Sequence, residues 1–303
     1  MHIPQHLLDG SICPVTAVVS GLCLAGAAVA AHRSAEKPHP LRFAAITAFI
    51  FAAQMMNFPI SGGTSGHLLG GVLASALLGV PFGVLALALV VTIQALVFAD
   101  GGLTVLGANV LNMAVLGAGL GGLLRWGLLK QLPAGEARVW TATALASWAS
   151  VMLAALACAV ELALAGVLPL ARVVPAMLGV HAWIGLGEAL ITCAALALLG
   201  RPATVGAVSV SRGFAVPTLA ALLIALCLSP FASSLPDGLE AIMTQYQVLH
   251  EAAPWFVTPL ADYQIVGVTA ETLSTGLAGL IGVVLTFLIA GALAVPLTRP
   301  RAA

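Results

Sequence analysis

The sequence carries very little charge. Of its 303 residues only 7% are Asp, Glu, Lys or Arg, whereas soluble domains carry about a quarter. So few charges cannot cover the surface of a soluble fold, and a hydrophobic content of 61% excludes an intrinsically disordered chain. The mean hydropathy is +1.10, and apolar runs recur along the whole length. The scarcity of charge therefore predicts a protein whose surroundings are the lipid bilayer.

The apolar runs lack the alternation of apolar and polar residues that membrane-spanning β-strands need. They are long, continuous and rich in Ala, Leu and Gly, so we expect an all-α, polytopic helical membrane protein. The predicted segments are 11–31, 43–60, 67–80, 82–99, 103–124, 139–166, 173–199, 214–230 and 275–296. Segment 67–80 is short for a hydrocarbon core of roughly 30 Å, and we expect it to be partly re-entrant or to merge with its neighbour.

The segments divide into two modules. We expect residues 1–205, the N-terminal module, to form a seven-span bundle with short loops. Residues 206–303, the C-terminal module, then form a two-span hairpin. The loop between the two spans of this hairpin covers about 231–274 and is too long for a simple connection.

Several motifs of other protein classes are missing. There is no GxxxxGK[ST] sequence for a nucleotide site and no HExxH sequence for a metalloprotease. The five cysteines form no CxxC pair, so we interpret them as packing residues rather than redox or disulfide partners. A net charge of zero and 6% aromatic residues exclude a nucleic-acid-binding surface. No Lys or Arg precedes the first apolar run, so we expect no cleavable signal peptide.

The loop charges sort to two sides of the predicted membrane. Ten of the eleven basic residues lie in alternate loops: Arg33, Lys37, Arg42, Arg125, Lys130, Arg138, Arg201, Arg212, Arg299 and Arg301. The opposite loops hold Arg172 and most of the acidic residues: Asp9, Asp100, Asp237, Glu240, Glu251, Asp262 and Glu271. The positive-inside rule then predicts a multi-pass protein of the cell membrane (inner or plasma membrane) with its N-terminus outside and its C-terminus in the cytoplasm.

The first dipeptide has the chemistry of a metal chelate. The α-amine of Met1, the amide nitrogen of His2 and the Nδ1 atom of His2 can bind one ion through a five-membered and a six-membered ring. Three nitrogens in one plane leave a fourth equatorial position open, an arrangement that suits Ni²⁺ or Cu²⁺ and excludes Mg²⁺ or Ca²⁺. The alternative is that the dipeptide binds nothing, as in many proteins that begin with Met-His.

A second candidate histidine ends a Gly- and Ser-rich stretch. Residues 57–70 contain His67 directly after Ser61-Gly62-Gly63-Thr64-Ser65-Gly66. An irregular segment at membrane depth must be buried in protein or line a cavity. His67 is predicted on the same side of the membrane as the N-terminus. It is either a functional residue of such a cavity or a structural histidine in a helix-capping loop.

Polar residues inside the predicted spans need partners, because an ionisable group there costs roughly 2.5–3.5 kcal/mol on insertion scales. His181 and Glu188 lie seven residues apart and therefore on one helix face, and Glu161 lies in the preceding span. We favour His181 as a contact between helices over a supporting residue of a site. The candidates for a supporting role around His67 are Asn57, Ser65, His181 and Glu188, and Asn109 and Asn112 either line the same cavity or pair with the backbone.

One alternative function is enzymatic. Gly63-Thr64-Ser65-Gly66 matches GxSG, and His181 lies on a later span. An intramembrane serine protease would use Ser65 as the nucleophile and His181 as its base. GxSG is short and common in glycine-rich chains, so the favoured hypothesis assigns no catalytic residue.

Four blocks of sequence together resemble one family. They are Met1-His2-Ile3-Pro4, the run from Gln54 to Gly71, Asp100-Gly101-Gly102-Leu103-Thr104 with Gly107-Ala108-Asn109, and Pro175–Ala182 with Gly185–Thr192. This pattern is similar to the CbiM/NikM family, the substrate-binding membrane components of cobalt and nickel energy-coupling factor transporters. Residues 230–240 resemble the PDGLE segment of the small CbiN/NikN-type companion, here fused to the C-terminus.

The resemblance implies an ATP-driven importer subunit and not an enzyme. It implies that one Ni²⁺ or Co²⁺ ion is bound as transported substrate by Met1, His2 and His67, without an organic cofactor. Of the two ions we favour nickel, because a planar set of four nitrogens suits it. It also implies a transmembrane coupling subunit and cytoplasmic ATP-binding subunits as partners, which fits the missing nucleotide motif. Many family members read Met-His-Ile-x-Asp-Gly, whereas here Gln5-His6-Leu7-Leu8 precede Asp9-Gly10. The first loop is therefore about four residues longer, and His6 is an alternative ligand.

Overall fold

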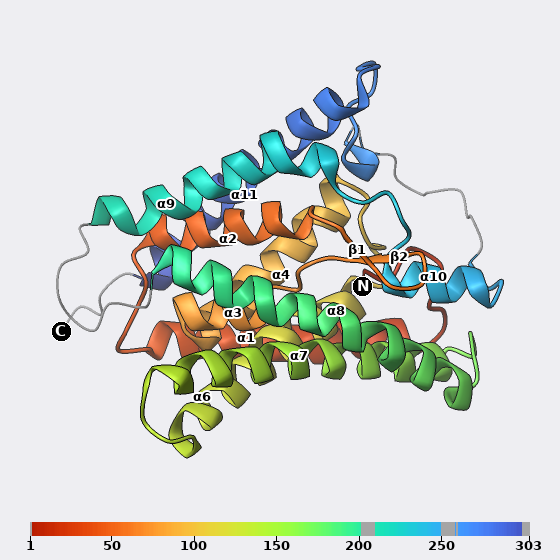
Figure 1. Ribbon diagram of the computed structural model, residues 1–303, viewed down its shortest axis with the longest axis horizontal. Coiled ribbons are helices and arrows are strands. Elements are labelled where there is room, and N and C mark those ends of the chain that lie inside the picture. The colour runs from red at the N-terminus through yellow and green to blue at the C-terminus, as the bar shows by residue number, and fades with distance from the viewer. Residues whose placement is uncertain (1, 201–209, 250–257, 259, 299–303) are drawn as a thin grey trace.

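The computed structural model describes residues 2–200, 210–249, 258 and 260–298, which are almost entirely helical (Figure 1). The N-terminal module contains α1 (Ile12–Arg33), α2 (Pro40–Gln54), β1 (Phe58–Ile60), β2 (Thr64–Gly66), α3 (Gly71–Leu78), α4 (Val80–Val97), α5 (Leu106–Asn109), the π-helix η1 (Val110–Leu120), α6 (Gly121–Gln131), α7 (Glu136–Leu164) and α8 (Leu170–Leu199). The C-terminal module contains α9 (Val210–Leu223), η2 (Ile224–Leu228), η3 (Ser229–Phe231), α10 (Gly238–Gln245), η4 (Ala261–Tyr263) and α11 (Glu271–Thr298).

Seven helices of the described chain are long and apolar enough to cross a membrane: Ile12–Arg33, Val80–Val97, Leu106–Gln131, Ala137–Leu164, Leu170–Leu199, Gly213–Phe231 and Glu271–Thr298. The apolar helices α2 and α3 are shorter, with 15 and 8 residues. Each predicted apolar segment contains a helix, so the all-α, polytopic membrane fold is confirmed. The shortness expected for the third segment is also found, because α3 rises only about 12 Å along its axis.

Two predicted segments are not continuous helices. The second was expected to run to residue 60, but α2 ends at Gln54 and residues 58–60 form β1, which pairs antiparallel with β2. The connecting turn contains Gly62 (φ 87°) and Gly63 (φ 74°), a left-handed conformation that glycine adopts without steric penalty. The third was expected to begin at residue 67, but residues 67–70 form no regular secondary structure and α3 begins at Gly71. This irregular stretch carries His67 between the hairpin and the bundle.

The two modules share a core around α2. Every residue of α2 from Phe43 to Gln54 is buried, and α9 and α11 of the C-terminal module pack against this helix. Gly282 of α11 allows the closest approach, because a Cβ atom there would lie 2.2 Å from the ring of Phe51. By contrast, α1 exposes large apolar side chains such as Val18 (62%) and Leu22 (69%), as expected of a helix that faces lipid.

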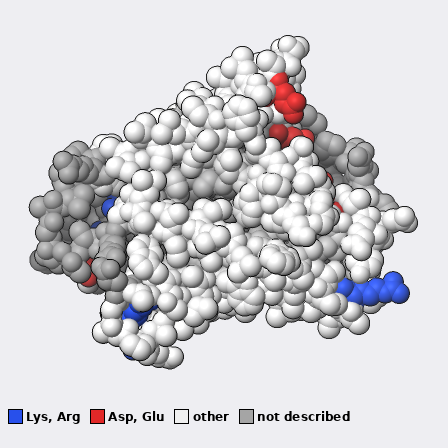
Figure 2. Space-filling view, viewed as in Figure 1, with Lys and Arg blue, Asp and Glu red and all other residues white. Residues whose placement is uncertain are grey.

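The helix ends separate the charges. The strands, α10 and the described N-terminal segment lie toward one end of the bundle, and α1 and α6 end at the other (Figure 1). Lys and Arg side chains gather mainly at the end where α6 terminates, whereas Asp and Glu side chains lie toward the opposite end (Figure 2). This distribution agrees with the loop sorting in the sequence, whereas the orientation of the two ends across the membrane stays a prediction.

The contact between α3 and η1 leads to a stability prediction. A Cβ atom at Gly71 would lie 2.4 Å from the carbonyl carbon of Gly117, so Gly71→Ala must push two helix backbones apart. We expect this substitution to destabilise the detergent-solubilised protein by about 1–3 kcal/mol, measured by thermal unfolding with tryptophan fluorescence. Gly127→Ala on α6 is the matched control, because a Cβ atom there meets no atom within 4 Å. Equal melting temperatures for the two variants would contradict the packing.

Candidate metal centre

The N-terminal segment folds back into the bundle, where hydrogen bonds to its main chain hold it in place. Asn109 accepts the amide hydrogen of Ile3 on Oδ1 (2.8 Å) and donates from Nδ2 to the Ile3 carbonyl (3.1 Å). The amide of Gly102 donates to the same carbonyl (3.0 Å), and the side chain of Ile3 is fully buried. Of the two roles considered for Asn109, pairing with the backbone is therefore the observed one, and this pairing fixes the position of His2.

The loop after α4 fits closely around this segment. A Cβ atom at Gly102 would lie 2.6 Å from the Cα atom of Gln5, so only glycine fits there. Gly101 adopts a left-handed conformation (φ 84°), and the amide of Leu103 donates to the side-chain oxygen of Gln5 (2.8 Å). The sequence Asp100-Gly101-Gly102-Leu103 thus provides a backbone surface on which the N-terminal segment lies.

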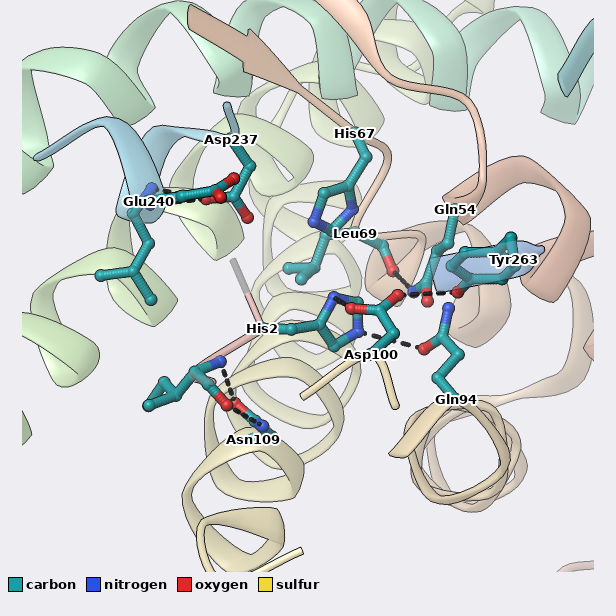
Figure 3. Close-up of polar contacts among 12 residues, drawn as sticks. His2, Gln54, His67, Leu69, Gln94, Asp100, Asn109, Asp237, Glu240 and Tyr263 are labelled. Carbon is teal, nitrogen blue, oxygen red and sulfur yellow. Dashed lines mark hydrogen bonds and ion pairs between the residues drawn. The ribbon is translucent and has the colours of Figure 1, made fainter. Parts of the chain in front are cut away.

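The side chain of His2 contacts polar groups on two elements (Figure 3). Its Nε2 atom lies 3.0 Å from Oε1 of Gln94 in α4, and its Nδ1 atom lies 3.1 Å from Oδ1 of Asp100. The imidazole ring stacks on that of His67, with ring centroids 5.3 Å apart and planes inclined by 16°. Two histidines separated by 65 positions in the sequence are therefore neighbours in the fold.

His67 is held by helices on both sides. The carboxylate of Glu188 in α8 accepts the amide hydrogens of Leu69 (2.5 Å) and Gly70 (2.9 Å). Gln54 in α2 donates to the carbonyl of Leu69 (2.7 Å), which fixes the same stretch from the opposite side. His67 Nδ1 lies 3.0 Å from the carbonyl of Leu68, and in the neutral tautomer that donates this bond the lone pair of the ring is on Nε2.

Both imidazoles are suited to bind a cation. Burial lowers the pKa of His2, and burial also lowers the pKa of His67, to about 3. Because the neutral ring is the form that binds a metal ion, both side chains are in their metal-binding protonation state at physiological pH.

The C-terminal module contributes directly to this region, which the sequence did not reveal. The amide of Ser65 donates to the carbonyl of Pro236 (2.8 Å), and the Ser65 hydroxyl donates to the carbonyl of Leu235 (2.7 Å). The backbone of Ser65 also forms an isolated parallel bridge with Asp237, so this part of the PDGLE segment lies against β2. Asp237 caps α10 by accepting the amide hydrogens of Leu239 and Glu240, both at 2.8 Å.

Both modules line one cavity of about 750 Å³. His2, His67 and Asp100 come from the N-terminal module, and Asp237, Glu240 and Asp262 come from the C-terminal module. A carboxylate-rich wall around two neutral imidazoles favours a cation over an anion in this cavity.

The four supporting candidates lie near the site in different ways. Asn57 lines the cavity, Ser65 binds the PDGLE segment and Glu188 holds the main chain after His67. His181 is buried beside Gly238, where a Cβ atom would lie 3.1 Å from its ring, and its Nδ1 atom bonds the carbonyl of Met177 (2.8 Å). His181 therefore borders the C-terminal module as well as the region of His67.

Two further polar residues form a pair away from the cavity lining. Asn112 in η1 donates to the carboxylate of Glu161 in α7 (2.7 Å), and both side chains are buried. Glu161 thus has the partner that its position inside a span requires.

The described contacts provide no nucleophile and base of a protease. The Ser65 hydroxyl donates to main-chain oxygens of the C-terminal module, and His181 bonds a carbonyl of its own helix. Met1 lies outside the described residues, so its predicted amine ligand is not placed. Within the described residues no group of three or more His, Cys, Asp or Glu side chains is arranged to hold a metal ion. The predicted site needs only two such side chains, because its other ligands are main-chain nitrogens.

Comparisons with known proteins agree with this architecture. The family model of CbiM, described as a cobalt uptake substrate-specific transmembrane region, matches residues 2–204, and the PDGLE domain model matches residues 212–299. A putative fused nickel transport protein NikMN of Archaeoglobus fulgidus is 33% identical over 298 residues, which cover 97% of this chain and 98% of that protein. The fused nickel transport protein NikMN of Rhodobacter capsulatus is 34% identical over 219 residues, which cover 66% of this chain and 62% of that protein.

A solved structure is also similar. The crystal structure of a transition metal transporter superposes with a TM-score of 0.58 at 32% identity and covers 66% of this chain and 92% of that one. The family match extends over the four sequence blocks that suggested the resemblance, and the second match covers the segments that close the cavity. The chain therefore belongs to the CbiM family, the substrate-binding membrane components of cobalt and nickel transporters, and carries a PDGLE domain on the same polypeptide.

Proposed function

We propose that this protein is the substrate-binding component of an ATP-driven importer of nickel or cobalt ions. The observation that carries the proposal is the contact between His2 and His67 inside a cavity lined by carboxylates. The names of its relatives, which are nickel transport proteins, and the cobalt uptake description of its family support a transition metal as the substrate. The metal is cargo, and the protein itself catalyses no reaction.

The proposed ligands are four nitrogens. They are the amine of Met1, the amide and Nδ1 nitrogens of His2, and Nε2 of His67. Such a set favours a square-planar ion, so nickel is the first choice and cobalt the second. Copper would bind a site of this kind more tightly, so the fit of the longer first loop or the supply of metal must decide the selectivity.

The remaining parts of the transport cycle need other subunits. Because the sequence contains no nucleotide-binding motif, cytoplasmic ATP-binding subunits supply the energy through a transmembrane coupling subunit. The end of the bundle that carries the strands and the acidic residues faces outside, where it receives the ion, and the basic end faces the cytoplasm. Residues 1–205 form the metal-binding module and residues 206–303 form the PDGLE module that covers it.

Removing either imidazole should abolish binding. We expect His2→Ala and His67→Ala to lose stoichiometric nickel, because each variant lacks one equatorial ligand, while thermal unfolding shows an intact bundle. Metal content after purification with the native N-terminus is the measurement. His32→Ala is the matched control, because His32 is an exposed residue in the last turn of α1. Full nickel occupancy in both site variants would contradict the ligand set.

The position of the amine gives a separate test. Four glycines added before Met1 convert its α-amine into an ordinary amide and remove the amine donor from the five-membered chelate ring. We expect this extension to lower nickel affinity at least a hundredfold, because a chelate arm is lost. The same four residues added at the C-terminus are the control, and titration with nickel reports both affinities. Unchanged binding by the extended protein would remove Met1 from the ligand set.

Acid should weaken binding with a defined slope. The Met1 amine and the His2 amide each release about one proton on binding between pH 6 and 7. The imidazoles release few, because burial lowers the pKa of His2 and lowers that of His67 to about 3. The logarithm of the nickel Kd should therefore change by about two for each pH unit in this range. Competition with a chelator of known proton affinity measures the slope, and a slope near zero would contradict amine and amide ligation.

A further inference from the structure

The described position of His2 is not the one that a chelated metal requires. Its Nδ1 atom, the nitrogen of the proposed chelate ring, faces the carboxylate of Asp100 at 3.1 Å. The ring also stacks face to face on His67, whereas the lone pair of an imidazole nitrogen lies in the plane of its ring. The two histidines are therefore adjacent but do not aim their nitrogens at a common point, and binding requires His2 to leave Asp100.

Asp100 is itself held by the C-terminal module. The hydroxyl of Tyr263 donates to Oδ2 of Asp100 (2.7 Å), which leaves Oδ1 directed at His2 (Figure 3). Burial and the adjacent Asp100 carboxylate raise the pKa of Tyr263 well above its usual value, so the hydroxyl keeps the proton that it donates. The hydrogen bond from Tyr263 to Asp100 and the contact between Asp100 and His2 thus connect the C-terminal module to the first histidine.

The backbone around Tyr263 is fixed against the end of α4. The Tyr263 ring stacks on Phe98, with centroids 4.7 Å apart and planes inclined by 20°. The amide of Asp262 donates to the carbonyl of Phe98 (2.9 Å), and the Thr258 hydroxyl donates to the carbonyl of Val97. Asp262 and Tyr263 both adopt the left-handed conformation (φ 53° and 57°), which non-glycine residues keep only when their surroundings impose it.

The two polar neighbours of His2 favour different tautomers. Asp100 accepts a proton carried on Nδ1, whereas Oε1 of Gln94 accepts a proton carried on Nε2 (3.0 Å). A metal on Nδ1 needs the second tautomer, with the proton on Nε2. Moving the proton from Nδ1 to Nε2 leaves the net charge of the ring unchanged. Asp100 therefore opposes metal binding, and Gln94 supports it.

We propose that Asp100 and Tyr263 form a restraint that holds His2 in its metal-free tautomer, and that an incoming ion must displace Asp100 from Nδ1. We call this pair the His2 restraint. It rests on the proposed function, since it assigns to the C-terminal module a positioning role in the same site. The restraint weakens equilibrium binding and eases release of the ion, and it operates through a single hydroxyl group of the C-terminal module.

The matched test is Tyr263→Phe, which keeps the ring that stacks on Phe98 and removes only the hydroxyl. We expect nickel to bind about three- to tenfold more tightly, because Asp100 loses the bond that orients it. Gln94→Met should have the opposite effect and weaken binding, because the metal-binding tautomer loses its acceptor. Tyr246→Phe is the control, because Tyr246 is the second tyrosine of the chain and, unlike Tyr263, does not line the cavity.

A second measurement reports the tautomer without metal. Nitrogen-15 NMR of histidine-labelled protein should show His2 protonated on Nδ1 in the parent protein and shifted toward Nε2 in Tyr263→Phe. Unchanged or weaker nickel binding by Tyr263→Phe, with the tautomer unaltered, would overturn the restraint while the parent protein still bound nickel. If the parent protein bound no nickel at all, the proposed function would fail instead, and the NMR comparison would still decide whether the restraint exists.

Discussion

The site depends on the transfer of the N-terminal segment from water into the bundle. Fixing the backbone of residues 2–5 costs about 1–2 kcal/mol for each residue. Burial of Ile3 stabilises the folded-back segment by about 1.5–3 kcal/mol. Each hydrogen bond from Asn109, Gly102 and Leu103 stabilises it by about 0.5–1.5 kcal/mol. These terms nearly cancel. The segment is therefore held weakly, and at the proposed site an ion bound to His2 would supply a large part of its stability.

The C-terminal module is part of the site rather than an appended pair of spans. An exposed strand edge has unpaired backbone N–H and C=O groups that can bond to another segment. At β2, residues 235–237 lie along that edge. Asp237 then lies on the cavity wall with His67, and Tyr263 reaches His2 through Asp100. Fusion of the two modules in one chain keeps both contacts together at high effective concentration, which a separate companion subunit must achieve by association.

Much of the fold could be predicted from composition, because only helices satisfy the backbone across long apolar runs. The family was also predictable, since its sequence blocks are specific. His2 and His67, both singled out from the sequence, are neighbours in the structure, and their role as metal ligands stays a prediction. The strands β1 and β2 were not predictable, because three-residue strands are defined by their partner and not by their own sequence. The contacts of Asp237 and Tyr263 were missed because they join residues more than 160 positions apart. Asn109 was noted as an intramembrane polar residue, but only the structure shows that it holds Ile3.

X-ray absorption spectroscopy of the nickel-loaded protein with its native N-terminus tests the central claim most directly. The account predicts a four-coordinate, planar shell of nitrogen ligands with the outer-shell scattering of imidazole rings, and loss of this spectrum when the metal is removed. A six-coordinate shell of oxygen ligands without imidazole scattering would contradict it, because such an ion would lie among the carboxylates of the cavity instead of on the folded-back N-terminal segment.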